Sequence, residues 1–442
     1  MVCLESDLRD GQMMEVEVRH HSVLLTRSEG KYTAIGNQCT HYGAPLSKGV
    51  ITGQTVRCPW HGACFNALTG DLEEYPGIDG LPCHKTLWQK TRIKRMGAAV
   101  PGVTHTILLL GGGAASLICA EILRQENFGG RIILATRDEL LPYDKTRLSK
   151  VMNVESDTIL LRKREFYHQY DIEVWLRKEA LSVDTNKKTV TFDDGSVQSY
   201  DQLLISTGCR AKPLDVPGMN LDNVKMLETP EDKNVKFHMS DHVTEIKGVD
   251  GKVKEVMLRS GKIVPADIVV VGIGSKPNSE FLRGSKIQMD PKNFVTVDKY
   301  MRTNVPGVFC AGDVATFPLA MAKDRMVNIG HWQMAQAHGR IAALNMLQKQ
   351  TELNSVPFYW TILLGATIRY AGCGEGYTDI VIKGKFEDMK FLALYIKDDE
   401  VVAAASLNFD PAVSAVAERL VAGKAITKKE AESHDLSWLK LS

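Results

Sequence analysis

The sequence has no long apolar run and no excess of either charge. Its 442 residues include 54 Lys and Arg against 53 Asp and Glu, a formal net charge of +1. Nucleic-acid-binding proteins usually carry a clear basic excess, so we expect no nucleic-acid partner. A membrane-spanning helix needs about 20 consecutive apolar residues, and because no stretch approaches that length we expect no transmembrane segment.

The first residues also lack the pattern of a targeting segment. Glu5, Asp7 and Asp10 precede any apolar run. Signal peptides need an apolar centre and transit peptides are poor in acidic residues. The sequence therefore predicts an intracellular protein, with the cytoplasm as one candidate compartment.

Cysteine is scarce for a disulfide-stabilised protein. The chain has 9 cysteines, an odd number spread thinly over its length, which is a poor disulfide framework. Apolar residues make up 44% and charged residues 24%, a mixture typical of folded globular proteins. The length is enough for about three domains.

Two of the cysteines stand near histidines at a spacing typical of metal ligands. Residues 15–35 alternate like short strands and predict a small all-β module, and two segments follow it, Cys39-Thr-His41 and Cys58-Pro-Trp-His61. A zinc finger usually places its two histidines together on a helix. Here each segment supplies one Cys and one His, as in a [2Fe-2S] cluster in which two histidines replace two cysteines on one iron. The segments resemble the Rieske motif; a structural zinc is the alternative.

A strand-like apolar run, a glycine-rich turn and a helix pattern then follow one another in the letters ILLLGGGAASLICAEILR. Gly111 and Gly113 occupy the first two positions of G-x-G-x-x-G, and the small Ser116 stands at the third. Such a turn brings the N-terminal amides of a helix to a pyrophosphate. We therefore expect Gly111, Gly113, Ala114 and Ala115 to contact a dinucleotide.

Three later segments support an FAD site, because their order is that of a flavoprotein with two dinucleotide domains. They are residues 203–208, 268–274 and 307–315.

The segment Pro142-Tyr-Asp-Lys145 with Leu148-Ser-Lys150 resembles the flavin-flanking PY-x-R-x-x-L-S-K segment of the apoptosis-inducing factor family. Lys145 replaces the usual Arg, while Lys150 matches. The resemblance implies further FAD contacts from the later segments, with Asp313 meeting the ribityl chain and Trp332 lying behind the flavin ring. These contacts are Thr207, Gly208, Gly312, Asp313 and Trp332. The alternatives are Asp313 as a helix N-cap and Trp332 in an ordinary amphipathic helix.

A Rieske module fused to this reductase resembles a Rieske-containing branch of that family over nearly the whole chain, which implies a mitochondrial location. The expected fold class is α/β plus all-β: a Rieske β-domain, a doubly wound FAD-binding domain with a truncated NAD-type subdomain, and a C-terminal α+β domain. The expected divisions are 1–95 (Rieske [2Fe-2S] domain), 96–103 (linker), 104–215 (first half of the FAD domain), 216–266 (remnant of the NAD(P)H-binding subdomain), 267–345 (second half) and 346–442 (reductase-type domain).

A second glycine-rich nucleotide turn, which reductases of this class use for NADH, is absent. Between Gly208 and Gly272 the glycines are isolated. A βαβ unit needs about 30 residues and a nucleotide domain on the order of 100. The start of the NADH subdomain is therefore missing, by exon skipping or natural loss, and strands that packed on it would expose apolar surface.

These patterns predict an oxidoreductase that passes electrons from a small-molecule donor through FAD and the [2Fe-2S] cluster to an acceptor such as a protein or quinone. The cofactors carry this chemistry, so no catalytic side chain is demanded. Direct use of NADH is expected to be impaired, and NAD(P)H or another donor is left open. The alternative is a non-catalytic pro-apoptotic signalling or binding scaffold.

Overall fold

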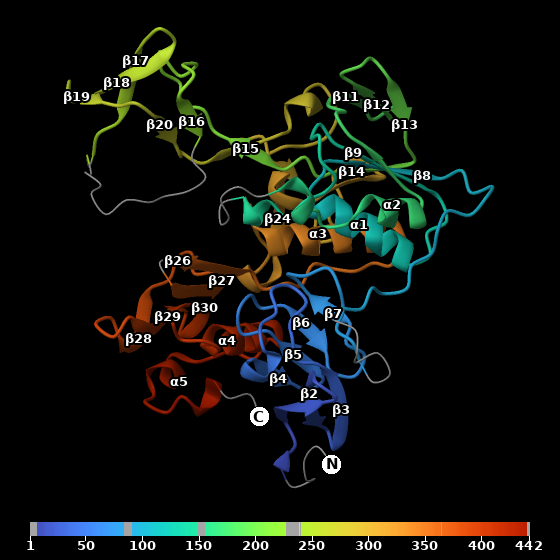
Figure 1. The fold of residues 1–442 in the computed structure, drawn as a ribbon, viewed down its shortest axis with the longest axis vertical. Helices are drawn as coiled ribbons and strands as arrows, with labels where there is room; N and C mark the ends of the chain where they lie inside the picture. Colours follow the sequence, from blue (N-terminus) through green and yellow to red (C-terminus); the bar gives the residue numbers. More distant parts are fainter. Residues whose placement is uncertain are drawn as a thin grey trace.

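Four lobes make up the protein. Figure 1 shows the N-terminal β-lobe and the C-terminal domain side by side at one end, the flavin-type domain beyond them, and a small lobe of strands that stands apart. The structure is a computed structural model and describes residues 7–83, 91–148, 155–226, 238, 240–363 and 365–439. Lys150 lies outside these residues.

The N-terminal lobe consists of two small antiparallel sheets with strand orders β1-β2-β3 and β4-β5-β6-β7. Their short strands are separated by turns, such as the hairpin at Glu29-Gly30, where both residues have positive φ. The core of the lobe includes Leu24, Ile35 and Phe65. The elements are β1 (Gln12–Val18), β2 (His21–Ser28), β3 (Lys31–Gly36), η2 (Leu46–Lys48), β4 (Val50–Thr52), β5 (Thr55–Arg57), β6 (Cys64–Asn66) and β7 (Leu72–Glu74).

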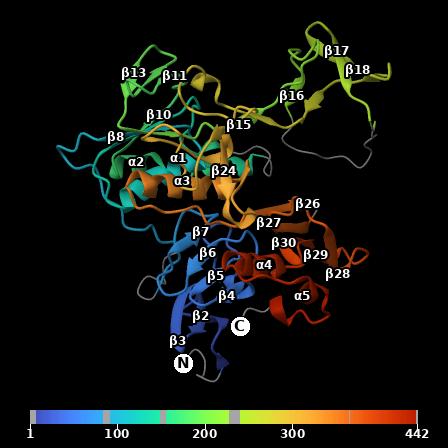
Figure 2. The same ribbon diagram turned by 180° about the vertical axis from the view of Figure 1, so that it is seen from behind.

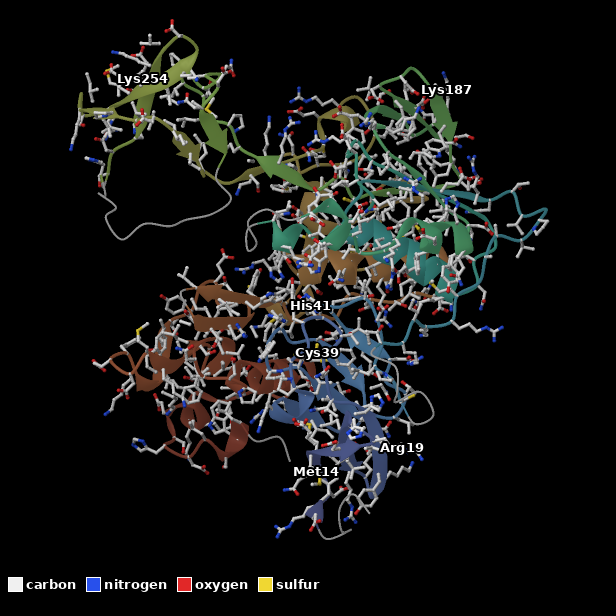
Figure 3. All side chains as sticks on the ribbon, viewed as in Figure 1. Met14, Arg19, Cys39, His41, Lys187 and Lys254 are labelled. Atoms are coloured by element: carbon white, nitrogen blue, oxygen red, sulfur yellow. The ribbon has the colours of Figure 1, made fainter. Side chains whose placement is uncertain are left out.

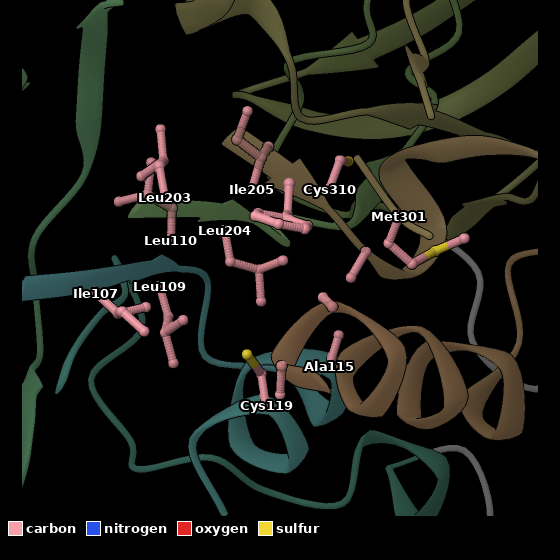
Figure 4. Packing of buried hydrophobic residues seen from close by; sticks show 14 of the residues in the cluster. Ile107, Leu109, Leu110, Ala115, Cys119, Leu203, Leu204, Ile205, Met301 and Cys310 are labelled. Carbon is pink, nitrogen blue, oxygen red and sulfur yellow. The ribbon is translucent and has the colours of Figure 1, made fainter. Parts of the chain in front are cut away.

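The flavin-type domain is built on a parallel sheet of five strands in the order β10-β9-β8-β14-β23. Parallel strands buried on both faces need continuous apolar sequences. Figure 4 shows side chains of β8, including Ile107 and Leu109, above Ala115 and Cys119 of α1. The elements up to the sheet's fourth strand are β8 (Thr106–Leu110), α1 (Ala114–Gln125), β9 (Arg131–Ala135), η4 (Lys145–Arg147), η5 (Ser156–Thr158), α2 (Arg164–Gln169), β10 (Ile172–Trp175), β11 (Ala180–Asp184), β12 (Thr189–Phe192), β13 (Val197–Ser199) and β14 (Gln202–Ile205).

The second half of this domain returns to the same sheet through β23 and adds helix α3 beside α1. A Cβ on Gly339 of α3 would lie 2.2 Å from the backbone oxygen of Ala115, so only glycine lets the two helices approach this closely. The elements are η6 (Glu280–Leu282), β22 (Val295–Thr296), β23 (Val308–Cys310), η7 (Gly312–Val314), β24 (Ala315–Leu319), η8 (Ala320–Ala322), β25 (Arg325–Val327) and α3 (Trp332–Met346).

The lobe between the two halves contains strands and turns in its described residues. Figures 1 and 2 show it projecting from the flavin-type domain, away from both chain termini. Strands β17 and β18 form an antiparallel hairpin that turns at Asp250-Gly251. The elements are β15 (Cys209–Ala211), β16 (Val224–Met226), β17 (Val243–Val249), β18 (Lys252–Leu258), β19 (Ile263–Pro265), β20 (Val269–Val271) and β21 (Ser275–Pro277).

Strand β20 differs from its expected place. The sequence analysis grouped residues 268–274 with the second half of the FAD domain, but β20 pairs with β16 in a two-stranded sheet of the projecting lobe. Apolar side chains in and beside this strand are exposed. They are Val270 within the strand, and Ile268 and Ile273 on either side of it. An apolar run alone does not distinguish a strand of the main sheet from a strand of a small, partly exposed sheet.

The C-terminal domain is an antiparallel sheet in the order β26-β27-β30-β29-β28, with α4 packed on β27 and β30. The elements are β26 (Phe358–Leu363), β27 (Ala366–Gly372), β28 (Asp379–Lys385), β29 (Lys390–Lys397), β30 (Glu400–Leu407), α4 (Ala412–Val421), α5 (Lys428–Glu432) and η9 (Ser437–Leu439). Among the described residues, no helix has the length and apolarity required to cross a membrane. The expected fold class of α/β plus all-β lobes is confirmed.

Candidate cluster and flavin sites

The four predicted metal ligands meet at the end of the N-terminal lobe. Figure 3 places Cys39 and His41 where this lobe faces the flavin-type domain. Cys39 follows β3 and Cys58 follows β5, and both are buried. The Nδ1 atoms of His41 and His61 lie 3.1 Å apart. The two loops therefore present one pair of thiols and one pair of imidazoles.

The thiol pair is arranged to lose protons to a metal. Cys39 and Cys58 hydrogen-bond each other, and the backbone amides of His41 and His61 donate to Cys39 and Cys58, respectively. The hydrogen bond with Cys58, followed by burial, raises the pKa of the Cys39 thiol. Without a cation, two neighbouring thiolates repel each other and the pair retains a proton. A bound iron would replace that proton and balance the negative charge.

The imidazole pair is held neutral. Burial lowers the pKa of His41 to about 3. The pKa of His61 is lowered to about 2, mainly by burial and to a smaller extent by His41 and Arg369. A neutral imidazole has a ring-nitrogen lone pair available for a metal. Within the described part of the chain, no three His, Cys, Asp or Glu side chains surround a single point that could hold one ion. Two ligand pairs fit the two irons of a Rieske cluster.

A cavity of about 530 Å³ opens at the carboxyl end of the parallel sheet, a size typical of cofactor sites. It brings together ten of the eleven residues that the sequence analysis singled out for FAD. They are Gly111, Gly113, Ala114, Ala115, Lys145, Thr207, Gly208, Gly312, Asp313 and Trp332. The eleventh, Lys150, is outside the described residues.

The cavity wall suits the phosphates of a dinucleotide. No side chain caps the N-terminus of α1 at Gly113, and a Cβ built on Gly113 would meet no atom within 4 Å. The helix amides thus face open space, where an anion can accept their hydrogen bonds. Gly111 has φ +123°, and a Cβ there would lie 2.2 Å from the Ser206 oxygen, so the turn itself requires glycine. These residues fit FAD.

The carboxylate of Asp313 faces this cavity from the turn η7. Ala311, not Asp313, is the N-cap of this short 3-10 helix, and Asp313 lies within its single turn. The N-cap alternative therefore does not apply. Burial raises the pKa of the Asp313 carboxyl, and Lys145 partly opposes the change. A buried hydrogen-bonding group at this position is suited to a ribityl hydroxyl.

The sequence analysis missed several residues that complete the two sites. Arg137 lines the cavity just after the end of β9. Lys178 and Arg210 add positive charge to the wall. Trp360 of β26 lies against His61 and His41, with ring centroids 5.0 and 5.8 Å apart. No local pattern marks Trp360, because its partners are about 300 residues earlier in the chain.

Three protein families match successive parts of the chain. The Rieske [2Fe-2S] domain matches residues 1–85, the pyridine nucleotide-disulphide oxidoreductase family matches residues 105–234 and 224–339, and the reductase C-terminal family matches residues 358–438. The second family matches in two pieces that overlap at residues 224–234.

Curated relatives match across the same regions. Apoptosis-inducing factor 3 from Homo sapiens is 42% identical over 99% of this chain and 87% of its own length. The ferredoxin--NAD(+) reductase subunit of the benzene 1,2-dioxygenase system from Pseudomonas putida is 25% identical over 74% of this chain and 95% of its own.

The alignment with the human relative is longer than this chain. It extends over 531 residues while this chain has 442. At least the difference between these lengths, 89 positions, has no counterpart here. That length is close to the roughly 100 residues of a small nucleotide-binding domain.

Solved structures share the reductase fold. The ferredoxin reductase for the CYP199A2 system from Rhodopseudomonas palustris has a TM-score of 0.69 at 23% identity, covering 76% of this chain and 99% of that one. The covalent putidaredoxin reductase-putidaredoxin complex has a TM-score of 0.69 at 20% identity, covering 77% of this chain and 98% of that one. At these identities the likeness concerns the fold.

Proposed function

The chain belongs to the pyridine nucleotide-disulphide oxidoreductase family, in a form that carries a Rieske [2Fe-2S] domain, and we propose that it transfers electrons from FAD to the cluster within one polypeptide. FAD accepts electrons in pairs and releases them singly, whereas a [2Fe-2S] cluster carries one at a time. A reductase and its redox partner would thus be joined permanently.

The observation that carries this proposal is the docking of the cluster loop beside the cavity. The hydroxyl of Tyr42, next to His41, donates to Asp144 Oδ2 at 3.2 Å. Asp144 immediately precedes Lys145, which lines the cavity. A fixed contact at this position keeps the cluster ligands beside the flavin site without any domain movement.

Buried contacts behind the loop support a rigid arrangement. Gln336 of α3 donates to the backbone oxygen of Gly77 at 2.8 Å, and Arg162 bridges Asp79 of the Rieske lobe and Glu121 of α1 at 2.7 and 2.9 Å. Ion pairs that are shielded from water hold their geometry more firmly than surface pairs. The domain docking is therefore suited to repeated electron transfer over a constant distance.

The residues have separate roles in this proposal. The two cysteines and two histidines hold the irons, the α1 amides bind the FAD pyrophosphate, and Asp313 orients the ribityl chain. Trp332 covers one side of the flavin position and excludes water from it. No acid, base or nucleophile from the protein is required, because the protein supplies position and electrostatics while the cofactors supply reactivity.

The donor in this proposal is not NADH acting directly. The missing segment of at least 89 positions, the two-piece family match and the strands of the projecting lobe support this. Nicotinamide dinucleotides need a glycine turn followed by a helix N-terminus, and from Lys212 to Ser279 the described residues form strands and turns. A small-molecule donor that needs no such subdomain would reduce the flavin.

The acceptor proposed here is a one-electron acceptor that meets the cluster, such as a small redox protein. One of the similar structures is a complex of putidaredoxin reductase with putidaredoxin, which supports a protein acceptor by analogy. A mitochondrial location is the prediction that accompanies the apoptosis-inducing factor resemblance.

The test uses the holoprotein under argon, with absorbance and electron paramagnetic resonance spectra recorded during titration. Near-stoichiometric NADH should leave the flavin band unchanged, while dithionite should bleach it. In a separate measurement, light reduces the flavin, and the electron should reach the cluster at a rate that does not depend on protein concentration, because the transfer occurs within one chain. The variant Cys39→Ser, which removes one iron ligand, provides a control with flavin but no cluster signal.

Each alternative outcome contradicts a separate part of the proposal. Bleaching by NADH would contradict the loss of direct nicotinamide use. A rate proportional to protein concentration would contradict transfer within one chain. A purified protein that takes up neither cofactor would favour the scaffold interpretation.

A further inference from the structure

We propose that strand β28 pairs with β28 of a second copy of this chain, so that two C-terminal sheets join into one continuous sheet across a two-fold axis. β28 is the last strand in the order β26-β27-β30-β29-β28. Figures 1 and 2 show it at the outer end of the C-terminal domain, on the side away from the Rieske lobe. The iron ligands contact β26 at the opposite edge, so this assembly is independent of the proposed function.

The outer edge of β28 is open to a partner. On its inner edge β28 pairs with β29 along its whole length, and among the described residues no strand pairs with it on the other side. The peptide groups along such an edge can hydrogen-bond to a strand of another chain. The opposite edge strand, β26, is already in contact with the Rieske lobe, where Phe358 packs on Gly62. β28 is therefore the edge of this sheet that can accept a second copy.

Isoleucine side chains make this edge apolar on one face of the sheet. Ile380 and Ile382 are 44% and 37% exposed. Between them, Val381 packs toward the core beneath α4, so the two isoleucines point to the opposite face. A strand that pairs here removes the most apolar surface from water if it also presents apolar side chains on that face.

The sequence of β28 is complementary to itself in the antiparallel direction. Residues 379–383 read Asp-Ile-Val-Ile-Lys. With the two-fold axis at Val381, Asp379 of each copy lies opposite Lys383 of the other, and the isoleucines lie opposite one another. Directly opposed residues share one face with their Cβ atoms about 5 Å apart, where opposite charges and matched apolar groups stabilise the pair. The seam thus contains two ion pairs and a continuous isoleucine stripe.

Contacts within the chain hold the two charged side chains on the face opposite the isoleucines. Asp379 Oδ2 lies 3.3 Å from Lys428 Nζ of α5, and Lys383 Nζ donates to the backbone oxygen of Ser433 at 2.8 Å. The Asp379 side chain is still half exposed. Its carboxylate is therefore accessible to a lysine from another copy.

The backbone favours this register over its neighbour. Gly384 has φ +88°, which is outside the extended conformation of a strand, so regular pairing ends after Lys383. Moving the two-fold axis by one residue, to Ile382, would place the apolar Val381 opposite the charged Lys383. Only the axis at Val381 matches every residue from 379 to 383.

Other edge strands of the same length lack this match. β1 also has seven residues, but antiparallel pairing about its central residue would place Glu15 opposite Glu15, and opposed like charges are destabilising. β17 pairs with β18 through two register shifts, and such irregularities disfavour the addition of another strand. Among these strands, charge and apolar pattern select β28.

Exposed side chains beyond the paired residues also come together. In this register the turn after β28, which carries Phe386 and Met389, lies beside the residues that precede β28 in the other copy, including Tyr377. All three side chains are exposed in the single chain. The two-fold axis repeats each contact, so both ends of the seam would bury apolar surface.

The test reverses these charges in the holoprotein and measures the dimer dissociation constant by sedimentation velocity over a concentration series. The wild type should dimerise. Asp379→Lys places a lysine opposite Lys383, and Lys383→Asp places an aspartate opposite Asp379. Each variant changes two attractive pairs into repulsive ones and should raise the dissociation constant about tenfold. Glu17→Lys makes the same kind of change on the exposed edge strand β1 and should leave the constant unaltered.

Two rescue experiments identify the strand and its register. The double variant Asp379→Lys/Lys383→Asp exchanges the charges and should dimerise like the wild type. An equimolar mixture of the two single variants should form mixed dimers, because the lysines of one copy oppose the aspartates of the other. A damaged fold would give neither result.

Three outcomes would overturn this pairing. One is a wild type that stays monomeric at its highest soluble concentration. The second is a dimer that neither single reversal weakens, which would place the contact elsewhere, such as at β20. The third is a double variant that keeps the wild-type melting temperature yet does not regain dimerisation.

Discussion

The guanidinium of Arg57 in the Rieske lobe donates through Nε to the carboxylate of Glu418 in the C-terminal domain, and both side chains are almost fully buried. Arg57 also pairs with Glu74 Oε2 at 2.8 Å and donates to the backbone oxygen of Gly62 at 2.9 Å. These charged side chains lie directly beneath the loop that carries Cys58 and His61. The ion pairs therefore join the Rieske lobe to the C-terminal domain next to the iron ligands.

Glu418→Gln should therefore destabilise the protein. The neutral amide leaves the buried Arg57 charge with Glu74 as its remaining carboxylate, and we expect a loss of roughly 3 kcal/mol, the lower end of the cost of breaking a buried pair. Urea unfolding of the holoprotein measures this loss. Glu352→Gln makes the same chemical change in an exposed pair with Lys299 and should cost less than about 1 kcal/mol. Equal losses of stability in the two variants would contradict this role of the Arg57–Glu418 pair.

Gly339→Ala should disturb the helix pair beneath the flavin site. The added methyl would lie 2.2 Å from the Ala115 oxygen, and that oxygen belongs to helix backbone that cannot move alone. We expect a loss of about 1–3 kcal/mol, as in other overpacked cores, together with a lower melting temperature and reduced flavin content. An unchanged melting temperature would contradict the close approach of α1 and α3.

Gly113→Ala should separate flavin binding from folding. A Cβ at this position meets no protein atom within 4 Å, so the stability of the flavin-free protein should change by less than about 0.5 kcal/mol. The methyl would occupy space that the pyrophosphate needs, and FAD affinity should fall. Reconstitution followed by flavin fluorescence measures the affinity; unaltered binding would show that the phosphate does not lie at this turn.

His338 should make stability depend on pH. Burial lowers its pKa to about 3, and its Nδ1 accepts the amide hydrogen of Gly312 at 3.1 Å. An unfolded histidine has a pKa near 6.5, so below pH 6.5 the unfolded state takes up a proton that the folded state refuses. The stabilisation is complete above about pH 6.5 and is lost toward pH 3 at about 1.4 kcal/mol per pH unit.

Urea unfolding at about pH 7, 6 and 5 would compare the wild type with His338→Gln, which should show a shallower dependence on pH. His20→Gln removes a fully exposed imidazole and serves as the matched control. If His338→Gln and the wild type lose stability in parallel, another group is responsible.

The projecting lobe should promote self-association. Ile268, just before β20, and Val270, within it, are 65% and 49% exposed. Val270→Lys should raise the temperature at which light scattering begins, because a charged edge resists pairing with another chain. Val197→Lys, at an exposed position on β13, is the matched control. Equal scattering from the two variants would contradict a role for this face.

The elements that followed from local pattern were predicted well. The apolar run and glycine turn before α1 predicted β8 and the helix. The paired Cys-x-His and Cys-x-x-His segments predicted two ligand loops. Strand β20 was expected in the second half of the FAD domain and pairs with β16 instead, because an apolar run does not show which sheet it joins.

The sequence by itself determined the chemistry: which side chains can bind iron, and where a glycine turn can accept a pyrophosphate. These features are local, so spacing along the chain reveals them. Only the tertiary structure decided which domains meet. Arg57 and Glu418 are 361 residues apart, and Trp360 contacts ligands from the first domain. Contacts over such separations leave no period in the sequence, because they arise from complementary surfaces that form after each domain has folded.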